Sequence, residues 1–276
     1  MSARAVLVTG ASTGIGAATA SSLADAGFIV FAGVRDEAAA RAIARANVTP
    51  LTLDVTDAAA IADAAETVAQ SGHVLAGVVN NAGIAVGGPL EFLPIDELRR
   101  QFEINVFGAI AVSQAFLPHL RASRGRLVFV GSVSGRLAVP FIGPYSASKF
   151  ALRALSDALR LELARAGIAV ALIEPGSVKT PIWQKALAAR ERMVRALPPQ
   201  ALQFYGVQLD ALYKQIEGEE RGGIAVERVS AAIVHALTAA TPRTNYLVGF
   251  PARAGSILGM LPAAVRDRIL FRPLRG

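Results

Sequence analysis

The sequence predicts an α/β protein in which a doubly wound, mostly parallel sheet forms a single domain. Short apolar runs alternate with helix-like segments along the chain, which is the order of elements in such sheets. A glycine-rich turn joins the first apolar run directly to the first helix. Hydrophobic residues make up 53% of the 276 residues and charged residues only 18%, which suits a large buried sheet and excludes a disordered chain.

Each predicted strand is a short apolar run, and each predicted helix repeats apolar residues every three or four positions. The seven predicted strands span residues 6–9, 28–33, 51–55, 74–79, 126–130, 168–173 and 245–248. The predicted helices span residues 17–26, 38–46, 58–69, 94–119, 144–163 and 226–237. The alternation breaks over residues 181–223, which we expect to cover a pocket, and a basic extension, 251–276, follows the domain of residues 1–250.

Composition narrows the possible classes of protein. The chain has no cysteine, which excludes disulfides and thiolate metal sites. Its histidines, His73, His119 and His235, are too scattered to predict a metal site. We expect a cytoplasmic protein, because the sequence shows neither a signal peptide nor an apolar run of about 20 residues. The net charge of +7 favours weak attraction to anions, but no motif predicts nucleic-acid binding.

The glycine-rich turn at residues 10–16 predicts a phosphate-binding site. Gly10, Gly14 and Gly16 follow the pattern G-x-x-x-G-x-G between a predicted strand and a predicted helix. Glycine lets backbone amides and the amino end of the helix approach a phosphate that a side chain would block. Glycine turns also serve packing, so the strand-to-helix setting is what favours the phosphate site.

Tyr145 and Lys149 form a candidate acid/base pair. A helix that begins near Pro144 places both side chains on one face, one turn apart. A free phenol titrates at about pH 10, and a fixed neighbouring cation lowers that pKa towards neutrality. Ser132, just after a predicted strand, can hydrogen-bond the same reacting oxygen, and Ser134 is a weaker rival because it lies two residues nearer the tyrosine.

These motifs occur in an order that resembles the short-chain dehydrogenase/reductase family. The residues that carry the resemblance are Gly10, Gly14, Gly16, Asn80, Asn81, Ala82, Gly83, Ser132, Tyr145 and Lys149. It implies a single-domain Rossmann fold, an NAD(P) cofactor, hydride transfer to or from a carbonyl or carbinol carbon, and a homo-dimer or homo-tetramer. The segments 31–35, 148–151 and 175–183 look most like the branch containing hydroxysteroid, retinol and 3-hydroxybutyrate dehydrogenases.

The resemblance also implies residue roles. Tyr145 would exchange the proton, Ser132 would bind the substrate oxygen, and Lys149 would favour the phenolate and bind the nicotinamide ribose. Asn105 would kink its helix and hold a relay water, and the alternative is a core asparagine bonded only to backbone. The implied cofactor contacts are Gly10, Ser12, Thr13, Gly14, Ile15, Gly16, Arg35, Asp54, Val55, Asn81, Ala82, Gly83, Tyr145, Lys149, Pro175, Gly176, Val178 and Thr180.

Arg35 predicts the choice of cofactor. In the family an acidic residue that holds the adenosine ribose lies at the strand end, where Val34 aligns, and a basic residue directly after it marks NADP preference. NADP(H) is therefore favoured. NAD(H) is the alternative, because a one-residue shift would put Asp36 on the ribose, although Asp36 could instead cap the next helix. Thr13 occupies the other basic position associated with NADP preference.

The sequence leaves the substrate and the surfaces open. Apolar residues of the segment 181–223 favour a hydrophobic alcohol or ketone, such as a steroid, retinoid or lipid, although ordinary packing is an alternative for each. These residues are Trp183, Leu187, Met193, Phe204 and Tyr205. The leucine stripe of helix 144–163 suits packing against a second copy or within the chain.

Two further alternatives concern the extension and the function. After residue 250 five arginines stand against one acid, Asp267, which is compatible with weak contact with a membrane surface, a cover over the pocket or a solvated terminus.

A catalytically silent NAD(P)-binding regulator is the alternative function. The complete set of Asn105, Ser132, Tyr145 and Lys149 favours the enzyme.

Overall fold

The computed structural model describes residues 3–182, 184, 188, 194–195 and 197–271. Seven strands form one parallel sheet in the order β3-β2-β1-β4-β5-β6-β7. They are β1 (Arg4–Val8), β2 (Ile29–Val34), β3 (Val48–Thr52), β4 (Val74–Asn80), β5 (Arg126–Val130), β6 (Ala169–Pro175) and β7 (Asn245–Val248). The chain runs outward from β1 to β3 and then crosses to β4, so the sheet is doubly wound. The predicted fold class is confirmed.

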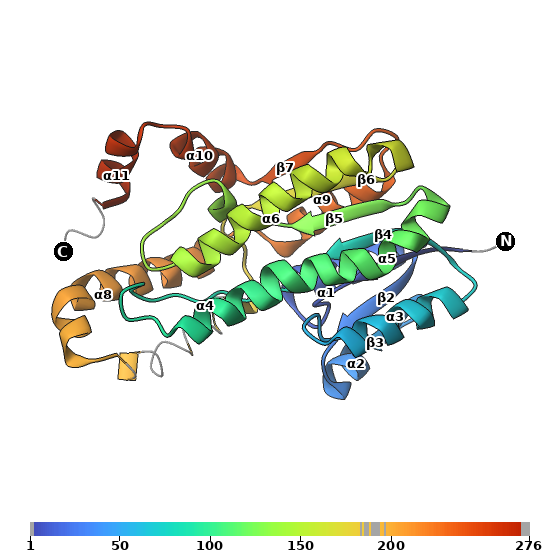
Figure 1. Ribbon diagram of the computed structural model, residues 1–276, viewed down its shortest axis with the longest axis horizontal. Coiled ribbons are helices and arrows are strands. Elements are labelled where there is room, and N and C mark those ends of the chain that lie inside the picture. Colours follow the sequence, from blue (N-terminus) through green and yellow to red (C-terminus); the bar gives the residue numbers. More distant parts are fainter. Residues whose placement is uncertain (1–2, 183, 185–187, 189–193, 196, 272–276) are drawn as a thin grey trace.

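Helices cover both faces of the sheet (Figure 1). They are α1 (Gly14–Asp25), α2 (Glu37–Ile43), α3 (Ala58–Gln70), α4 (Ile95–Phe102), the π-helical η1 (Glu103–Gly108), α5 (Ala109–Ser123), the 3₁₀ helix η2 (Val133–Gly135), α6 (Gly143–Glu162), η3 (Ala164–Ala166), α8 (Pro199–Gly222), α9 (Val226–Thr238), α10 (Phe250–Gly259) and α11 (Ala263–Phe271). Val6 and Val8 of β1 join the core beneath α1 and α9, whereas Ala5 and Leu7 join the core beneath α3, α5 and α6. This alternation follows from the two-residue period of a strand.

The third strand differs from its sequence prediction. β3 spans Val48–Thr52 rather than residues 51–55, and it contains Pro50. Proline cannot donate a backbone hydrogen bond, but β3 is an edge strand, where that loss is tolerated. The first helix also begins earlier than predicted, at Gly14 inside the glycine turn.

All seven strands point the same way, so their carboxyl ends share one edge of the sheet. The glycine turn, the segment after Asn80, the turn at Ser132 and the loop after Pro175 all lie at this edge. In Figure 1 the helices α8 and α11 lie at the left, beyond this edge. None of the helices in the described part of the chain combines the length and apolarity needed to span a bilayer.

Candidate active site

The predicted catalytic residues meet where β5 ends and α6 begins. Tyr145 lies in the first turn of α6, where Pro144 suits a helix start, and Lys149 follows one turn later. Ser132 is the N-cap of η2, and its hydroxyl shares a hydrogen bond with the Tyr145 hydroxyl. The ammonium nitrogen of Lys149 lies 5.7 Å from the centre of the Tyr145 ring. Ser134, the sequence rival, donates its backbone N–H to the Ser132 hydroxyl at 3.1 Å, an arrangement that favours Ser132.

Burial controls the proton affinities of this group. Tyr145 and Lys149 are 8% and 6% exposed. Burial raises the pKa of Tyr145, and the hydrogen bond from Ser132 lowers it by a smaller amount. Burial lowers the pKa of Lys149 to about 8. The expected lowering of the tyrosine pKa by Lys149 is not found, and the Lys149 ammonium donates a hydrogen bond to the Val130 carbonyl at 2.8 Å. Both changes follow from the cost of burying a charged form.

Asn105 lies within the π-helical segment η1, which interrupts the helical stretch from α4 to α5. Its side chain accepts from the Ile84 N–H at 2.9 Å and donates to the Ile84 carbonyl at 3.0 Å. It also donates to the Ser148 hydroxyl at 3.2 Å, which in turn donates to the Tyr145 carbonyl at 2.7 Å. A Cβ on Gly83 would lie 3.3 Å from the Asn105 amide oxygen. Asn105 therefore joins the segment after β4 to the tyrosine turn, and a relay water remains a prediction.

Gln101 also connects α4 to the segment after β4, and the sequence analysis did not predict this role. It is completely buried on α4, four residues before Asn105. Its amide accepts from the Val86 N–H at 2.7 Å and donates to the Ile84 carbonyl at 2.9 Å. A longer contact of 3.4 Å reaches Ser148. The available signal was the spacing, since a glutamine four residues before an asparagine shares its helical face.

The glycine turn packs against the segment after β4 with no room for side chains. Gly10 has φ +62°, and a Cβ on it would lie 2.8 Å from the Ala82 Cα. A Cβ on Gly16 would lie 2.3 Å from the Gly10 carbonyl oxygen. The Asn81 side chain donates to the carbonyls of Thr9 and Gly10 at 2.9 and 3.1 Å. The turn itself therefore requires glycine at these positions, and Asn81 fixes its shape.

The amino end of α1 suits the phosphate of a nucleotide cofactor. Its N-cap residue, Thr13, makes no side-chain hydrogen bond to the helix, and both Ser12 and Thr13 are exposed. A Cβ on Gly14, at φ +57°, would lie 3.3 Å from the Thr180 side chain. The loop after β6 thus lies beside the turn. Amide groups at a helix terminus that no side chain caps favour an anion.

Arg35, Asp36 and Asp54 surround the ends of β2 and β3. Asp36 is the N-cap of α2, and its carboxylate accepts from the first turn at 2.8 Å. Asp54 has a lowered pKa, chiefly because it accepts the Thr56 N–H, and the charge of Arg35 contributes. Asp57, not Asp54, caps α3. Arg35 is exposed beside the group of predicted adenosine contacts.

The remaining predicted contacts lie on the same edge. Gly176 follows the last residue of β6, and a Cβ on it would lie 2.9 Å from the backbone nitrogen of Ala252 in α10. Val178 forms a β-bridge with Ile224. The others, Ile15, Val55, Ala82, Gly83 and Pro175, occupy the turns and strand ends already described. The structure therefore gathers residues from six different loops.

An aromatic cluster joins α8 to the segments that carry Phe92 and Phe141, the second of which leads into the helix of Tyr145. The Tyr205 ring lies 6.2 Å from Phe92, 5.8 Å from Phe141 and 6.5 Å from Phe204, measured between centroids. Its hydroxyl donates to Glu91 at 2.8 Å. Leu209, Leu212, Tyr213 and Ile216 of α8 are buried in the same cluster. The predicted pocket residues Trp183, Leu187 and Met193 lie outside the described residues.

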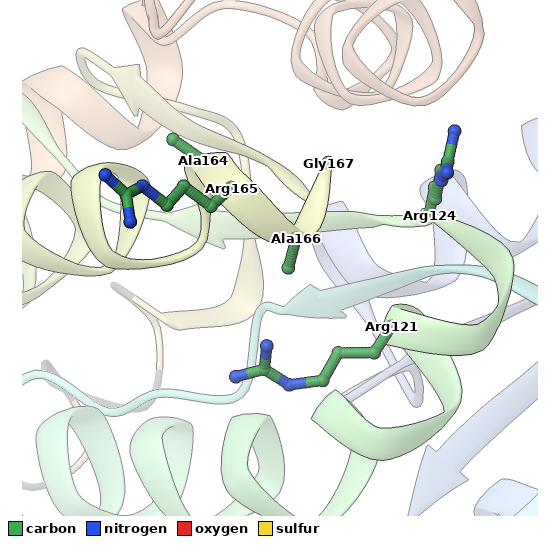
Figure 2. Close-up of a pocket in the computed structure, with 6 residues that line it drawn as sticks. All are labelled: Arg121, Arg124, Ala164, Arg165, Ala166 and Gly167. Carbon is green, nitrogen blue, oxygen red and sulfur yellow. The ribbon is translucent and has the colours of Figure 1, made fainter.

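A depression of about 530 Å³ lies at the opposite edge of the sheet. Figure 2 shows its lining residues, among which the side chains of Arg121 and Arg165 both extend to the left of the view and that of Arg124 extends upward. They precede the amino ends of β5 and β6, so this depression is separate from the tyrosine site. Within the described residues, no three His, Asp or Glu side chains are grouped as metal ligands.

Comparison with known proteins agrees with this geometry. A family model described as short chain dehydrogenase matches residues 4–191. An NADPH-dependent 3-dehydrocapnine reductase from Ornithobacterium rhinotracheale is 35% identical, with 99% of this chain and 98% of that protein covered. Human retinol dehydrogenase 5 is 36% identical over 96% of this chain and 87% of that protein. The mitochondrial D-beta-hydroxybutyrate dehydrogenase of Rattus norvegicus is 34% identical over 89% and 76%.

Solved structures show the same fold. A short chain dehydrogenase/reductase from Burkholderia phymatum in complex with NAD has a TM-score of 0.80 and 26% identity, over 93% of this chain and 92% of that chain. One from Burkholderia cenocepacia in complex with NADP has a TM-score of 0.73 and 25% identity, over 100% and 98%. The chain therefore belongs to the short-chain dehydrogenase/reductase family of nicotinamide-dependent oxidoreductases, in the branch that includes retinol and 3-hydroxybutyrate dehydrogenases.

Proposed function

We propose that the protein interconverts a secondary alcohol and a ketone with NADP(H). The observation that carries the proposal is the hydrogen bond between the Ser132 and Tyr145 hydroxyls, beside Lys149. Two buried hydroxyls that meet at one point can hold a single substrate oxygen between them. A silent nucleotide-binding regulator gains nothing from a buried Lys149 ammonium, which is costly to desolvate.

The residues divide the work of ketone reduction. Burial keeps the Tyr145 phenol protonated near neutrality, which is the form that donates a proton to the forming alkoxide. Ser132 hydrogen-bonds the same oxygen, and both contacts strengthen as negative charge develops there. Lys149 supplies positive charge beside the phenol, and Asn105 anchors a water that returns the proton. The bound nicotinamide supplies the hydride, or accepts it in alcohol oxidation.

Three observations support NADP(H) over NAD(H). Arg35 is exposed directly after β2 and can bind a 2′-phosphate. Asp36, the rival ligand for the ribose hydroxyls, is engaged as the cap of α2. A relative that matches 99% of the chain is described as NADPH-dependent. NAD(H) is the alternative, and one structural neighbour is in complex with NAD.

The aromatic cluster around Tyr205 supports a hydrophobic substrate. Phe141 belongs to it and lies four residues before Tyr145, so the cluster includes the segment that leads into the start of α6. A steroid-, retinoid- or lipid-like alcohol or ketone would bury its apolar part against such a wall. One relative is a retinol dehydrogenase, which agrees with this class.

Exposed apolar side chains support a homo-dimer or homo-tetramer. Leu152 of α6 and Leu163, which directly follows this helix, are buried in the core of the chain itself. Leu161 remains 69% exposed, and Phe107 and Phe150 are 57% and 42% exposed. A second copy would cover this surface.

The C-terminal helices support weak contact with an anionic membrane surface. Phe250 and Ile257 of α10 are 81% and 60% exposed, and its C-cap residue Met260 is 75% exposed. Arg253 is exposed on the same helix. α11 has no buried residue. Exposed apolar side chains among arginines suit the interface of a bilayer that contains anionic lipids.

The proposal is tested by titrating purified protein with NADPH and NADH, and then assaying a panel of hydrophobic ketones and secondary alcohols. We expect NADPH to bind about ten-fold more tightly, with turnover of at least one apolar ketone. Tighter binding of NADH would contradict the Arg35 assignment. Tight cofactor binding without turnover in either direction across the panel would favour the silent regulator.

A further inference from the structure

Helix α10 packs directly on the turn that carries the catalytic serine. A Cβ on Gly255 would lie 2.6 Å from a methyl group of Val133. A Cβ on Gly259 would lie 2.3 Å from the carbonyl oxygen of Arg136. Gly255 and Gly259 are one helical turn apart, so the backbone of α10 lies close to η2 and its C-cap at two positions. The extension of residues 251–276 thus begins with a helix that touches the active-site turn.

Arg136 connects this helix to the interior. Its guanidinium binds Glu174 in a fork, with Nε to Oε1 at 2.7 Å and Nη2 to Oε2 at 2.5 Å. The third nitrogen, Nη1, contacts the Ser256 hydroxyl of α10 at 3.4 Å. The Glu174 side chain is completely buried, and that of Arg136 is 17% exposed. The hydrogen bond to Glu174 raises the pKa of Arg136.

These contacts hold both ends of one short turn. Ser132 is the N-cap of η2 and Arg136 is its C-cap, so only three residues separate them. Glu174 is followed by Pro175 and Gly176, at the start of the loop that borders the glycine turn. A buried carboxylate is stable only with a well-oriented partner, which fixes the position of the arginine and therefore of η2.

We propose that Arg136 is a positioning residue for the Ser132 hydroxyl and that α10, by packing on η2 and contacting Arg136, helps to hold that hydroxyl in place. The inference rests on the proposed function for its effect on rate, because Ser132 must meet the substrate oxygen. The bidentate fork to Glu174, the Ser256 contact and the Gly259 packing then act together. A small displacement of η2 would move the Ser132 hydroxyl away from the Tyr145 hydroxyl.

The kinetic test uses Gly259→Ala, which adds a methyl group against the Arg136 carbonyl. The matched control is Ala254→Ser, which adds one atom to the exposed face of the same helix. We expect kcat for a ketone to fall about 10- to 100-fold in Gly259→Ala, with NADPH affinity within about two-fold of wild type. In a Ser132→Ala background the same change should cost less than about two-fold, because the positioned group is already absent.

The second arm does not depend on turnover. Hydrogen exchange of the backbone amides of residues 132–137 is compared in wild type, Gly259→Ala, Arg136→Lys and Ala254→Ser. We expect faster exchange in the first two variants and wild-type exchange in Ala254→Ser. Unchanged exchange in Gly259→Ala, or rate losses that multiply in the Ser132→Ala background, would overturn the proposal. Faster exchange in Gly259→Ala and Arg136→Lys of a protein that reduces no ketone would instead support the positioning of η2 by α10 and Arg136, and would refute the proposed function.

Discussion

The ammonium group of Lys149 donates a hydrogen bond to the carbonyl oxygen of Val130 at 2.8 Å. This contact anchors α6 to the end of β5 and holds a buried positive charge behind the Tyr145 ring. The lysine is therefore fixed beside the phenol by the sheet itself. Burial is the largest influence on the proton affinity of that phenol, and it raises the Tyr145 pKa.

Lys149 should make stability depend on pH. Its pKa is lowered to about 8 from the ordinary lysine value of 10.5, so between these values the unfolded chain binds more protons than the folded chain. The destabilisation from the buried charge is therefore fully present below pH 8 and is relieved as pH rises. Relative to Lys149→Met, wild type should gain about 2 kcal/mol of unfolding free energy between pH 7 and pH 9.5.

Chemical denaturation of both proteins across that pH range measures the difference. Lys179→Met is a suitable control, because Lys179 is exposed. A difference between wild type and Lys149→Met that does not change with pH would contradict the lowered pKa of Lys149.

Replacing Gln101 with leucine should destabilise the fold. The change leaves the buried Val86 N–H without its side-chain partner and removes one of the two side-chain donors of the Ile84 carbonyl, which keeps Asn105. We expect the free energy of unfolding to fall by about 2–4 kcal/mol. Urea denaturation measures it, with Gln70→Leu as the exposed control. A loss equal to that of the control would show that the Gln101 hydrogen bonds contribute little.

Arg35→Ala should weaken NADPH binding selectively. Loss of one exposed arginine contact to a phosphate predicts a rise of about ten-fold in Kd for NADPH, and less than about two-fold for NADH. Fluorescence titration measures both constants. Arg41→Ala removes another exposed arginine, one that pairs with Glu37, and should change neither constant. Equal losses for the two cofactors in Arg35→Ala would remove the basis for NADP preference.

The exposed face of α10 should bind anionic vesicles. The double variant Ile257→Ser/Met260→Ser removes two apolar side chains and leaves the buried face of the helix intact. We expect partitioning onto phosphatidylserine-containing vesicles to fall about ten-fold, and wild-type partitioning to fall as salt increases. Ile95→Ser, which changes an exposed isoleucine on α4, is the control. Identical partitioning of the two variants and wild type would contradict the membrane contact.

The order of elements was predictable, because apolar runs and helical periods are local properties of the sequence. The edge strand was misplaced over Pro50, since only the sheet order shows that β3 lacks an outer neighbour. The grouping of Tyr145, Lys149 and Ser132 was also predictable, because two of them share a helix and the third follows the strand before it.

The supporting contacts were not predictable in the same way. Arg136 and Glu174 belong to different elements, and nothing local in either segment indicates that they form a buried pair. The contact between Gly259 and the Arg136 carbonyl likewise depends on where α10 turns back after β7. The direction of the Lys149 ammonium was also beyond sequence reasoning, because it depends on which acceptor is nearest in the folded core.

Substitution of Tyr145 by phenylalanine tests the central claim, that this phenol exchanges the proton in a ketone reduction. Tyr246→Phe is the matched control, because its buried hydroxyl contacts His235 and the Arg243 N–H, away from the site. The two variants and wild type are compared for NADPH affinity and for turnover of the best ketone. We predict that Tyr145→Phe binds NADPH normally and loses about 10²- to 10⁴-fold in turnover, while Tyr246→Phe keeps its activity. Near-normal turnover by Tyr145→Phe would contradict the account.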